Sequence, residues 1–511
     1  MKSSPYFWSL LIASLFVMQC TSDSADVPEL GEVLISDEVQ MNPSGYAPLT
    51  AVISIETNIP TQLVLTVYAK TGEIDFIQPF GEIATQHELP VLGLFAEYNN
   101  QVQVAFFTSE GERIGDKEYL ITTQRLSPDL PAIQINEVRA DEMAPGWTLV
   151  SYFGHDSQET PQRAFMFDES GDIRWYLDFS SHPALNGLFY DNGIERLQNG
   201  NLYFGDRTTR KIYEINMLGE VLNTWDMPGY VFHHEVTEKP DGNFIALVSE
   251  LGAPTVEDIV IEIDRQANRI VQTWDLKESL QQDRTTLTSD TRDWIHVNAV
   301  EYSEQDDCII LSGRTQGVIK LTRDNQVVWI LGSHRGWRQS GRGEELGPYL
   351  LQPLDAQGME IDDDRVKNGD DPHPDFEWNW YQHAPQIMPD GNLILFDNGD
   401  NRHFSGSGQY SRAVEYAIDE ENNTVQQVWS YGKERGLGTY SRIVSDVDYD
   451  PVSNHVFFSP GAIQEPFLSG KVVEVDYTTM EVVFEATIRP PRAGFGIITL
   501  HRTERMPIYA P

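Results

Sequence analysis

The chain has 511 residues, with 78 acidic and 36 basic side chains, which gives a formal charge of −42. Binding to nucleic acid or to anionic lipid requires clustered Lys and Arg side chains. A chain this acidic is therefore not expected to bind either. Its hydrophobic share of 40% and aromatic share of 11% are enough for a large folded core. Two cysteines exclude a disulfide framework and a cysteine-based zinc module.

The first residues have the pattern of an export signal. Lys2 precedes an apolar stretch, residues 6–18, that is too short for a permanent membrane span. Cys20 follows at once and opens a polar run, which resembles the cleavage site of bacterial lipoproteins. We therefore expect a signal peptide over residues 1–19, export to the periplasm and a lipid anchor on Cys20. Ordinary signal cleavage is the alternative, because Gln19 replaces the usual small residue.

Residues 27–128 are expected to form an antiparallel β-sandwich. Apolar and polar residues alternate in segments such as Ala51–Glu56, Gln62–Ala69 and Gln101–Thr108, and turn signals separate these segments. About seven short strands in about 100 residues are typical of a sandwich. The segment 127–131 contains two prolines and is predicted to be a linker.

From residue 136 to residue 511 the sequence repeats with a period of about 50 residues. Each unit is rich in strands and closes on a strand with an aromatic residue. These aromatic residues are Trp175, Trp225, Trp274, Trp329, Trp429 and Phe484. The interval between the fourth and fifth of these aromatic residues, Trp329 and Trp429, holds one unit plus an insert at 333–380. Six such units predict a six-bladed β-propeller, whose first blade the strand Gly496–His501 would complete. The whole chain is therefore predicted to be all-β.

Three histidines occupy the same position in three units. His234 and His383 stand eight residues before the glycine of a turn, and His296 has the equivalent place. Asn192 takes this position in another unit, whereas His233 is out of register and is expected to pack. A propeller brings equivalent positions to one central channel, so we expect the three histidines to converge. A purely structural role in lining the channel is the alternative.

Arginines follow two of these histidines at similar distances. Arg314 comes eighteen residues after His296, and Arg402 and Arg207 are placed comparably. A guanidinium group among imidazoles would form a positive site with several donors in an acidic protein. Such a site suits a small tetrahedral oxyanion, sulfate or phosphate. A surface ion pair is the alternative for any one arginine.

Longer strings around these residues resemble the bacterial aryl-sulfate sulfotransferases. They are 293–298 with 311–314, 382–398, 411–416 with 428–432, and, near the N-terminus, 41–48 and 89–94. The resemblance implies an enzyme that moves a sulfuryl group from an aryl sulfate donor to a phenolic acceptor, without a nucleotide donor or another cofactor. It also leaves a homodimer open, because homodimers are known in that family. No Gly-rich phosphate-binding loop opens a helix in the sequence.

The resemblance also implies a role for each residue of the site. His383 matches the nucleophile of a ping-pong transfer through a sulfohistidine, and neutral imidazole is a suitable nucleophile. Arg314 and His296 would bind sulfuryl oxygens, Asn298 would be a further donor, and His234 would share proton transfer with the phenol oxygen.

The insert 333–380 carries an acidic run and several aromatic side chains. The run includes residues 362–364, 370 and 371, and its spacing does not match an EF-hand loop, so we expect a solvated loop. The aromatic residues Trp337, Trp378, Trp380 and Tyr381 could stack on an aromatic substrate or simply pack in the fold.

Two other functions remain open from the sequence. Three histidines around a channel could hold a catalytic metal ion. Against a metal, Arg314 would repel a divalent cation, and no carboxylate accompanies the histidines in register. A non-catalytic, exported binding propeller is the second alternative, because propellers serve many functions.

Overall fold

The computed structural model describes residues 27–70, 75–155, 163–188, 193–406, 409–464, 468–491 and 497–510. The predicted signal peptide, Cys20 and Asn192 lie outside these residues. The described helices are short: α1 (Leu30–Val33), α2 (Leu276–Ser279), α3 (Asp364–Lys367), η1 (Gly347–Tyr349), η2 (Arg402–Phe404) and η3 (Lys433–Gly438). In the described ranges, no helix has the length and apolar character needed to cross a membrane.

The N-terminal part is a five-stranded sheet built around one long strand. Its strands are β1 (Leu34–Met41), β2 (Ala51–Val67), β3 (Phe76–Val91), β4 (Asn99–Thr108) and β5 (Arg113–Thr122). Strand β2 pairs with β3 in both of its halves, with β1 in its first half and with β4 in its second. The predicted β domain is therefore present.

The prediction of about seven short strands was wrong, because the described part of this domain has five. The segments predicted as separate strands, Ala51–Glu56 and Gln62–Ala69, belong largely to the single strand β2. Burial keeps the same alternating phase at both ends of β2. The pairing with β3 shifts register between Glu56 and Thr61, where Pro60 has no N–H to donate. An irregularity within one strand thus replaces the expected turn.

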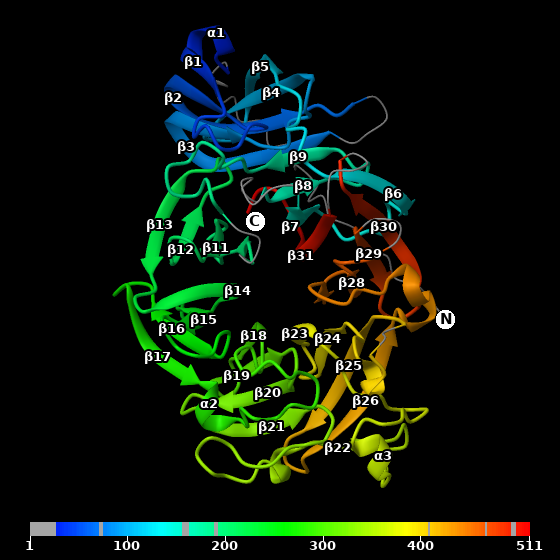
Figure 1. Ribbon diagram of the computed structural model, residues 1–511. Helices are drawn as coiled ribbons and strands as arrows, with labels where there is room; N and C mark the ends of the chain where they lie inside the picture. The colour runs from blue at the N-terminus through cyan, green and yellow to red at the C-terminus, as the bar shows by residue number, and fades with distance from the viewer. Residues whose placement is uncertain are drawn as a thin grey trace, which may run out of the picture.

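Residues 132–510 form further sheets of four or five strands, arranged around a common centre (Figure 1). The first of these sheets consists of β10 (Glu195–Arg196), β11 (Leu202–Asp206), β12 (Lys211–Ile215) and β13 (Val221–Asp226). The second consists of β14 (Tyr230–Glu238), β15 (Phe244–Glu250), β16 (Ile259–Asp264) and β17 (Arg269–Asp275). The third sheet consists of β18 (Val297–Ser303), β19 (Cys308–Gly313), β20 (Gly317–Thr322) and β21 (Val327–Leu331). The fourth consists of β22 (Gln352–Leu354), β23 (His383–Ile387), β24 (Leu393–Asp397), β25 (Arg412–Asp419) and β26 (Thr424–Tyr431). This arrangement is consistent with a β-propeller.

The remaining two sheets join segments from the two ends of the ring. Strands β27 (Asp446–Asp450), β28 (His455–Ser459), β29 (Gly470–Asp476) and β30 (Val482–Arg489) are completed by β6 (Ala132–Val138). Strand β31 (Ile497–Met506) pairs with β7 (Trp147–His155), which is followed by β8 (Phe165–Phe167) and β9 (Ile173–Tyr176). The predicted pairing of the C-terminal strand with the first unit is therefore confirmed. Each end of the ring segment is therefore held by strands far away in sequence.

The closing tryptophans connect each sheet to the next one. The indole N–H of Trp175 donates to the carbonyl of Met217 at 2.7 Å, and that of Trp274 donates to the carbonyl of Thr322 at 3.0 Å. Trp225 and Trp429 likewise donate to backbone carbonyls in later turns, and Trp329 donates to the carboxylate of Glu420. These indoles are buried, so the repeated aromatic residue both fills the core and satisfies a polar group.

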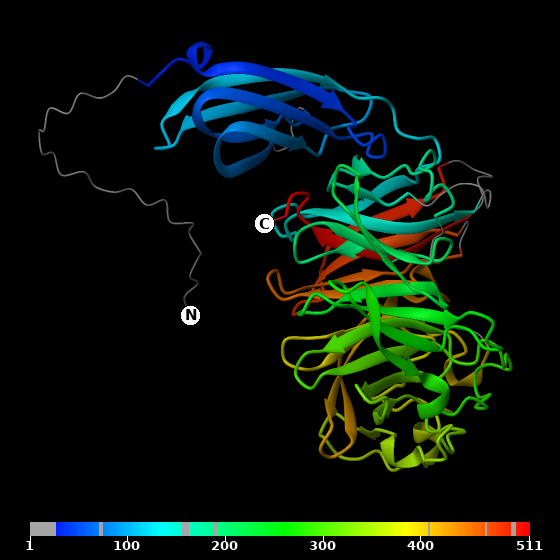
Figure 2. The same cartoon turned by 90° about the vertical axis from the view of Figure 1, so that its left-hand side faces the viewer.

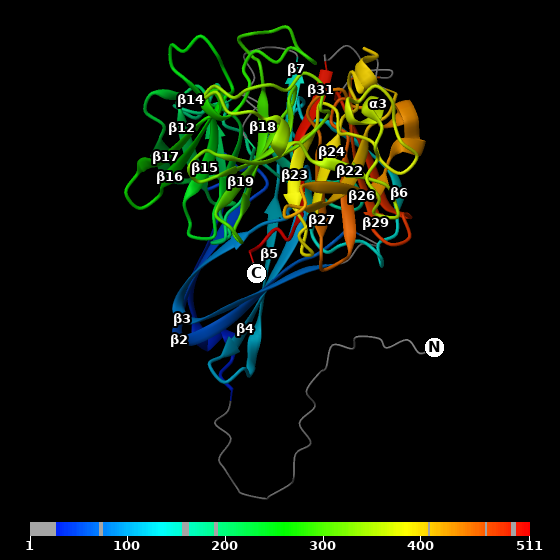
Figure 3. The ribbon, with the colours of Figure 1, turned by 90° about the horizontal axis from the view of Figure 1, so that it is seen from below.

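The N-terminal sheet lies beside one edge of the ring (Figures 2 and 3). The guanidinium group of Arg174 in β9 donates to the carbonyl of Gly93 at 2.6 and 3.1 Å. The hydroxyl of Tyr509 donates to the carbonyl of Pro90 at 2.7 Å and accepts from the amide of Leu92 at 2.9 Å. Both ends of the ring segment therefore contact the end of β3 and the turn that follows it.

Candidate active site

The predicted histidines stand on irregular backbone at the inner strands of three successive sheets. His234 in β14 has a φ of 55°, and His296, just before β18, has a φ of 52°. Ala384, next to His383 in β23, has a φ of 48°. The strand pairing shifts register at each of these places. Left-handed backbone is unfavourable for residues other than glycine and is concentrated at functional sites.

His234, His296 and Arg314 form one contact cluster. The Nε2 atoms of the two histidines are 3.2 Å apart, and their ring centroids are 5.0 Å apart. Nη1 of Arg314, in the turn after β19, lies 3.0 Å from Nε2 of His296. The backbone amide of Arg314 also donates to the carbonyl of His296 at 3.1 Å. Three of the predicted site residues therefore meet.

Two carboxylates face the opposite nitrogen of His296. Its Nδ1 lies 2.7 Å from Asp293 and 2.8 Å from Glu257. Burial lowers the pKa of His296, but these charges outweigh it and raise the pKa to about 9. Conversely, despite burial, the charge of His296 lowers the pKa of Glu257 to about 2. Carboxylates thus reach the histidines from outside the register of the repeat, because Asp293 stands three residues before His296 and Glu257 comes from the loop between β15 and β16.

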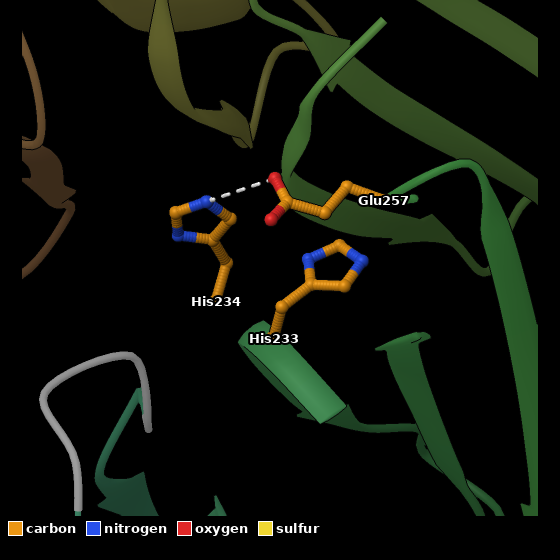
Figure 4. Close-up of side chains that lie close together, drawn as sticks. All are labelled: His233, His234 and Glu257. Carbon is orange, nitrogen blue, oxygen red and sulfur yellow. Dashed lines mark ion pairs between the residues drawn. The ribbon is translucent and has the colours of Figure 1, made fainter. Parts of the chain in front are cut away.

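His234 has the opposite electrostatic character from His296. Burial and the positive charge of His296 hold its pKa well below the usual value, so its ring is neutral near pH 7. Glu257 lies 3.7 Å from its Nε2 (Figure 4). On the other side, His501 of β31 stacks on His234 with a centroid distance of 5.7 Å. His233 is buried beside it, with ring centroids 5.5 Å apart. The sequence did not single out His501.

His383 is buried and has one ring nitrogen fixed. Its Nδ1 lies 2.7 Å from Oδ1 of Asn398 and 3.1 Å from the carbonyl of Tyr381. The Nδ2 group of Asn398 donates to the carbonyls of Ser441 and Val444, at 2.8 and 2.9 Å, so Oδ1 must accept. His383 therefore carries its hydrogen on Nδ1, which leaves a lone pair on Nε2.

The surroundings also keep His383 neutral. Burial lowers its pKa well below the usual value, and the charges of Arg502, Arg314 and His296 lower it further. These charges place His383 in the same electrostatic environment as the contact cluster, although no hydrogen bond joins it to the cluster among the described residues. A neutral, desolvated imidazole retains its nucleophilic lone pair at neutral pH.

Asn298 lies next to His383 rather than in the contact cluster. It is fully buried, and its Nδ2 donates to the carbonyl of Gln382 at 3.0 Å. Its Oδ1 is buried without a hydrogen-bond partner in the described chain. The backbone carbonyl of Asn298 accepts from Arg502 at 3.3 Å. Asn298 therefore supports the segment that ends at His383, and one of its two amide hydrogens is already used.

The other arginines suggested by the sequence are not part of this cluster. Arg402 is buried and pairs with Asp397 at 3.0 Å and Glu377 at 3.3 Å. Arg207 is exposed. The similar spacing of Arg402 in sequence therefore does not bring its guanidinium group to the histidines.

The insert contributes mainly packing. Trp378 and Trp380 are buried in a hydrophobic cluster between sheets, whereas Tyr381 lies under the guanidinium group of Arg314, at 5.7 Å from its ring centroid. Basic residues of the chain pair with the acidic run: Arg365 with Asp371, Arg335 with Asp370 and Lys367 with Asp362. Of the four aromatic residues named above, Tyr381 is placed best to border the site. Cys308 is buried, as its apolar strand suggests.

A cavity of about 270 Å³ lies between the inner strands of the ring. Its acidic lining residues are Glu195, Glu235, Glu301, Asp446, Asp448 and Glu504. Burial raises the pKa of Glu301 to about 8 and that of Glu504 to about 7. Arg502 connects this cavity to the histidine region, because it donates to Glu235 at 3.0 Å as well as to Asn298.

Potential metal-binding atoms occur in the histidine cluster. Those of His233, His234 and Glu257 lie within 4.8 Å of one another, as do those of Glu257, Asp293 and His296. However, His296 and Arg314 already balance the carboxylate charges, and a cation there would face the guanidinium group. The donor set is thus occupied by an ion-pair network that fits an anion better.

Comparisons with known proteins identify the family of this chain. The sequence profile of the family described as Arylsulfotransferase (ASST) matches residues 132–493, and that of the Arylsulfotransferase Ig-like domain matches residues 38–124. The chain belongs to the arylsulfotransferase family. The enzyme class implied by the resemblance is therefore confirmed, and the N-terminal sheet is the family's Ig-like domain.

Two relatives match over nearly their whole length. The arylsulfate sulfotransferase AssT of Escherichia coli O6:H1 (strain CFT073) is 29% identical over 564 aligned positions, which cover 90% of each chain. The arylsulfate sulfotransferase AssT of Lelliottia amnigena is 28% identical and covers 91% of this chain and 92% of its own. This member of the arylsulfotransferase family therefore has both domains of its relatives.

Proposed function

We propose that this enzyme transfers a sulfuryl group from an aryl sulfate to a phenol through a sulfohistidine at His383. The observation that carries the proposal is the fixed tautomer of His383. Asn398 holds the Nδ1 hydrogen, so the Nε2 lone pair is available in a region that also contains Arg314 and His296. Nucleophile and anion-binding cations are the two requirements of sulfuryl transfer.

In the first half-reaction, Nε2 of His383 attacks the sulfur and the bond from sulfur to the aryl oxygen breaks. The electron pair of that bond leaves with the aryl oxygen. Arg314 and protonated His296 bind the sulfuryl oxygens, whose negative charge they stabilise in the transition state. The departing oxygen receives a proton from the His234–His296 pair, whose Nε2 atoms are 3.2 Å apart.

In the second half-reaction, an acceptor phenol replaces the first product. The same histidine pair takes the phenolic proton, the phenol oxygen attacks sulfur, and the N–S bond to His383 breaks. His383 returns to its neutral form, and the aryl sulfate product leaves. The cycle balances without a cofactor, because proton and sulfuryl group are each taken up once and released once.

The ring that carries this site is proposed to be a six-bladed propeller. The support is the regular period of about 50 residues, the tryptophan contacts between successive sheets, and the pairing of β31 with β7. The proposed blades are the sheets that contain β7, β11, β15, β19, β24 and β28.

We propose that the protein is exported to the periplasm and anchored by a lipid on Cys20. The support is the apolar stretch at 6–18 and the cysteine that follows it. Mass spectrometry of the mature N-terminus from membrane fractions tests this, with Cys20→Ala as the comparison. A mature chain that begins elsewhere and lacks lipid would contradict the anchor.

The activity is tested by the release of 4-nitrophenol from 4-nitrophenyl sulfate, with and without added phenol. We expect phenol-dependent release that survives a chelator, disappears in His383→Ala and persists in the control variant His373→Ala. Loss of activity with the chelator would favour a metal-dependent enzyme. No turnover with any phenol would favour a binding propeller.

A further inference from the structure

We propose that Glu257 and Asp293 are positioning residues, which hold His296 in one orientation and as a cation that binds a sulfuryl oxygen. The inference rests on the proposed function and extends it, because neither carboxylate is assigned a role there. Both contact the Nδ1 side of the His296 ring and act through it, and Oε2 of Glu257 also lies 3.7 Å from Nε2 of His234.

Asp293 supplies the directed hydrogen bond. It lies three residues before His296, and its Oδ2 accepts from Nδ1 at 2.7 Å. Only the Nδ1–H form of the ring, or the doubly protonated form, can make this bond. The bond turns Nε2 towards Arg314 and His234, which lie 3.0 and 3.2 Å from it. Asp293 therefore orients the ring.

Glu257 supplies charge from a separate loop that is firmly held. Its amide donates to Oγ of Ser249 at 2.8 Å, and its carbonyl accepts from the amide of Val297 at 3.1 Å. The amide of Val256 also donates to the carbonyl of Arg292 at 3.0 Å. Glu257 has a φ of 57°, a conformation that is costly for glutamate. These bonds hold the strained loop so that Oε2 lies 2.8 Å from Nδ1 of His296.

The surrounding charges explain why two acids are needed. Charged or titratable groups that influence His296 or are influenced by it are Glu257, Asp293, Arg314, His234, His233 and His383. Arg314 and burial both disfavour a second positive charge on His296. Two carboxylates at Nδ1 outweigh these effects. Arg314 and protonated His296 are then two adjacent cationic donors that can bind an anion on the Nε2 side of His296.

The experiment follows His296 directly in full-length mature protein labelled with ¹³C at histidine Cε1. The signal of His296 is assigned by its loss in His296→Asn, and its titration is compared between wild type, Glu257→Gln and Asp293→Asn. We expect a midpoint near pH 9 in the wild type and a decrease of about one to three pH units in each variant. Glu304→Gln removes an exposed acid from the turn after β18 and should leave the midpoint unchanged.

Sulfuryl transfer is measured in the same variants as a function of pH. At about pH 8, kcat/KM for the aryl sulfate should fall about tenfold in Glu257→Gln, with the alkaline limb of the profile moved to lower pH. An unchanged midpoint and alkaline limb would overturn the inference, even if activity fell. If the wild type gave no turnover while the midpoint moved as expected, the proposed function would fail and the charge assignment would stand.

Discussion

The side-chain amide of Asn398 fixes which nitrogen of His383 carries the ring hydrogen. Its Nδ2 is committed to two backbone carbonyls, so its Oδ1, at 2.7 Å from Nδ1, can only accept. An amide thus orients the ring without adding negative charge. His383 therefore remains neutral, in contrast to His296, which two carboxylates keep protonated.

Removing the acceptor at Asn398 should impair the formation of sulfohistidine. In Asn398→Leu, only the more distant carbonyl of Tyr381, at 3.1 Å, remains to accept the Nδ1 hydrogen, so we expect the ring to be held less well and kcat to fall about 100-fold. The burst of 4-nitrophenol released in the absence of acceptor provides the measurement. Asn398→Asp keeps an acceptor but adds charge, which raises the pKa of His383, so the acid limb of its rate profile should move to higher pH. Equal rates in Asn398→Leu and wild type would refute the assignment.

Lysine should not replace arginine in the anion site. Arg314→Lys retains the charge but loses the forked donors, so we expect kcat/KM for the aryl sulfate to decrease at least about tenfold. Steady-state kinetics with varied donor concentration provide the measurement. Arg207→Lys, at an exposed position, serves as the control and should match the wild type. If both variants were equally active, the assigned role of Arg314 would be wrong.

The acidic cavity should make stability depend on pH. Burial raises the folded-state pKa of Glu301 from 4.5 to about 8, so the folded protein holds a proton that the unfolded chain releases. This contribution is complete below about pH 4.5 and is lost as pH rises through about 8. The Tm of the wild type should therefore decrease as the pH rises across this range, and this decrease should be smaller in Glu301→Gln. Thermal melts at several pH values measure both. A variant with the same pH dependence as the wild type would contradict this.

The tryptophan contacts between sheets should contribute measurably to stability. Trp274→Phe removes the indole donor to the carbonyl of Thr322, which keeps the amide of Asn325, and it replaces a buried indole by a smaller ring, so we expect a loss of about 1–3 kcal/mol in the free energy of unfolding. Denaturant unfolding followed by circular dichroism measures the change. Val271→Ala, on the same strand but 37% exposed, should cost clearly less. Equal losses in the two variants would argue against the role of the hydrogen bond.

Much of the architecture could be predicted from periodic features alone. A buried aromatic residue recurs in each unit because every sheet packs against the next in the same way, so Trp175, Trp225 and Trp274 mark the repeat directly. The N-terminal domain was less predictable. The alternation of apolar and polar residues is the same for two short strands as for one long strand, and only the pairing with β3 distinguishes them.

For the site, the register of His234, His296 and His383 could be predicted from the repeat, because equivalent positions of a repeat converge in the fold. The sequence did not reveal the residues that set their charge. Glu257 comes from the loop between β15 and β16, and His501 comes from β31, so both reach the histidines only in the folded chain, whereas Asn398 acts because two distant carbonyls fix its amide. Protonation depends on distance, burial and neighbouring charge, and these quantities exist only in the tertiary structure.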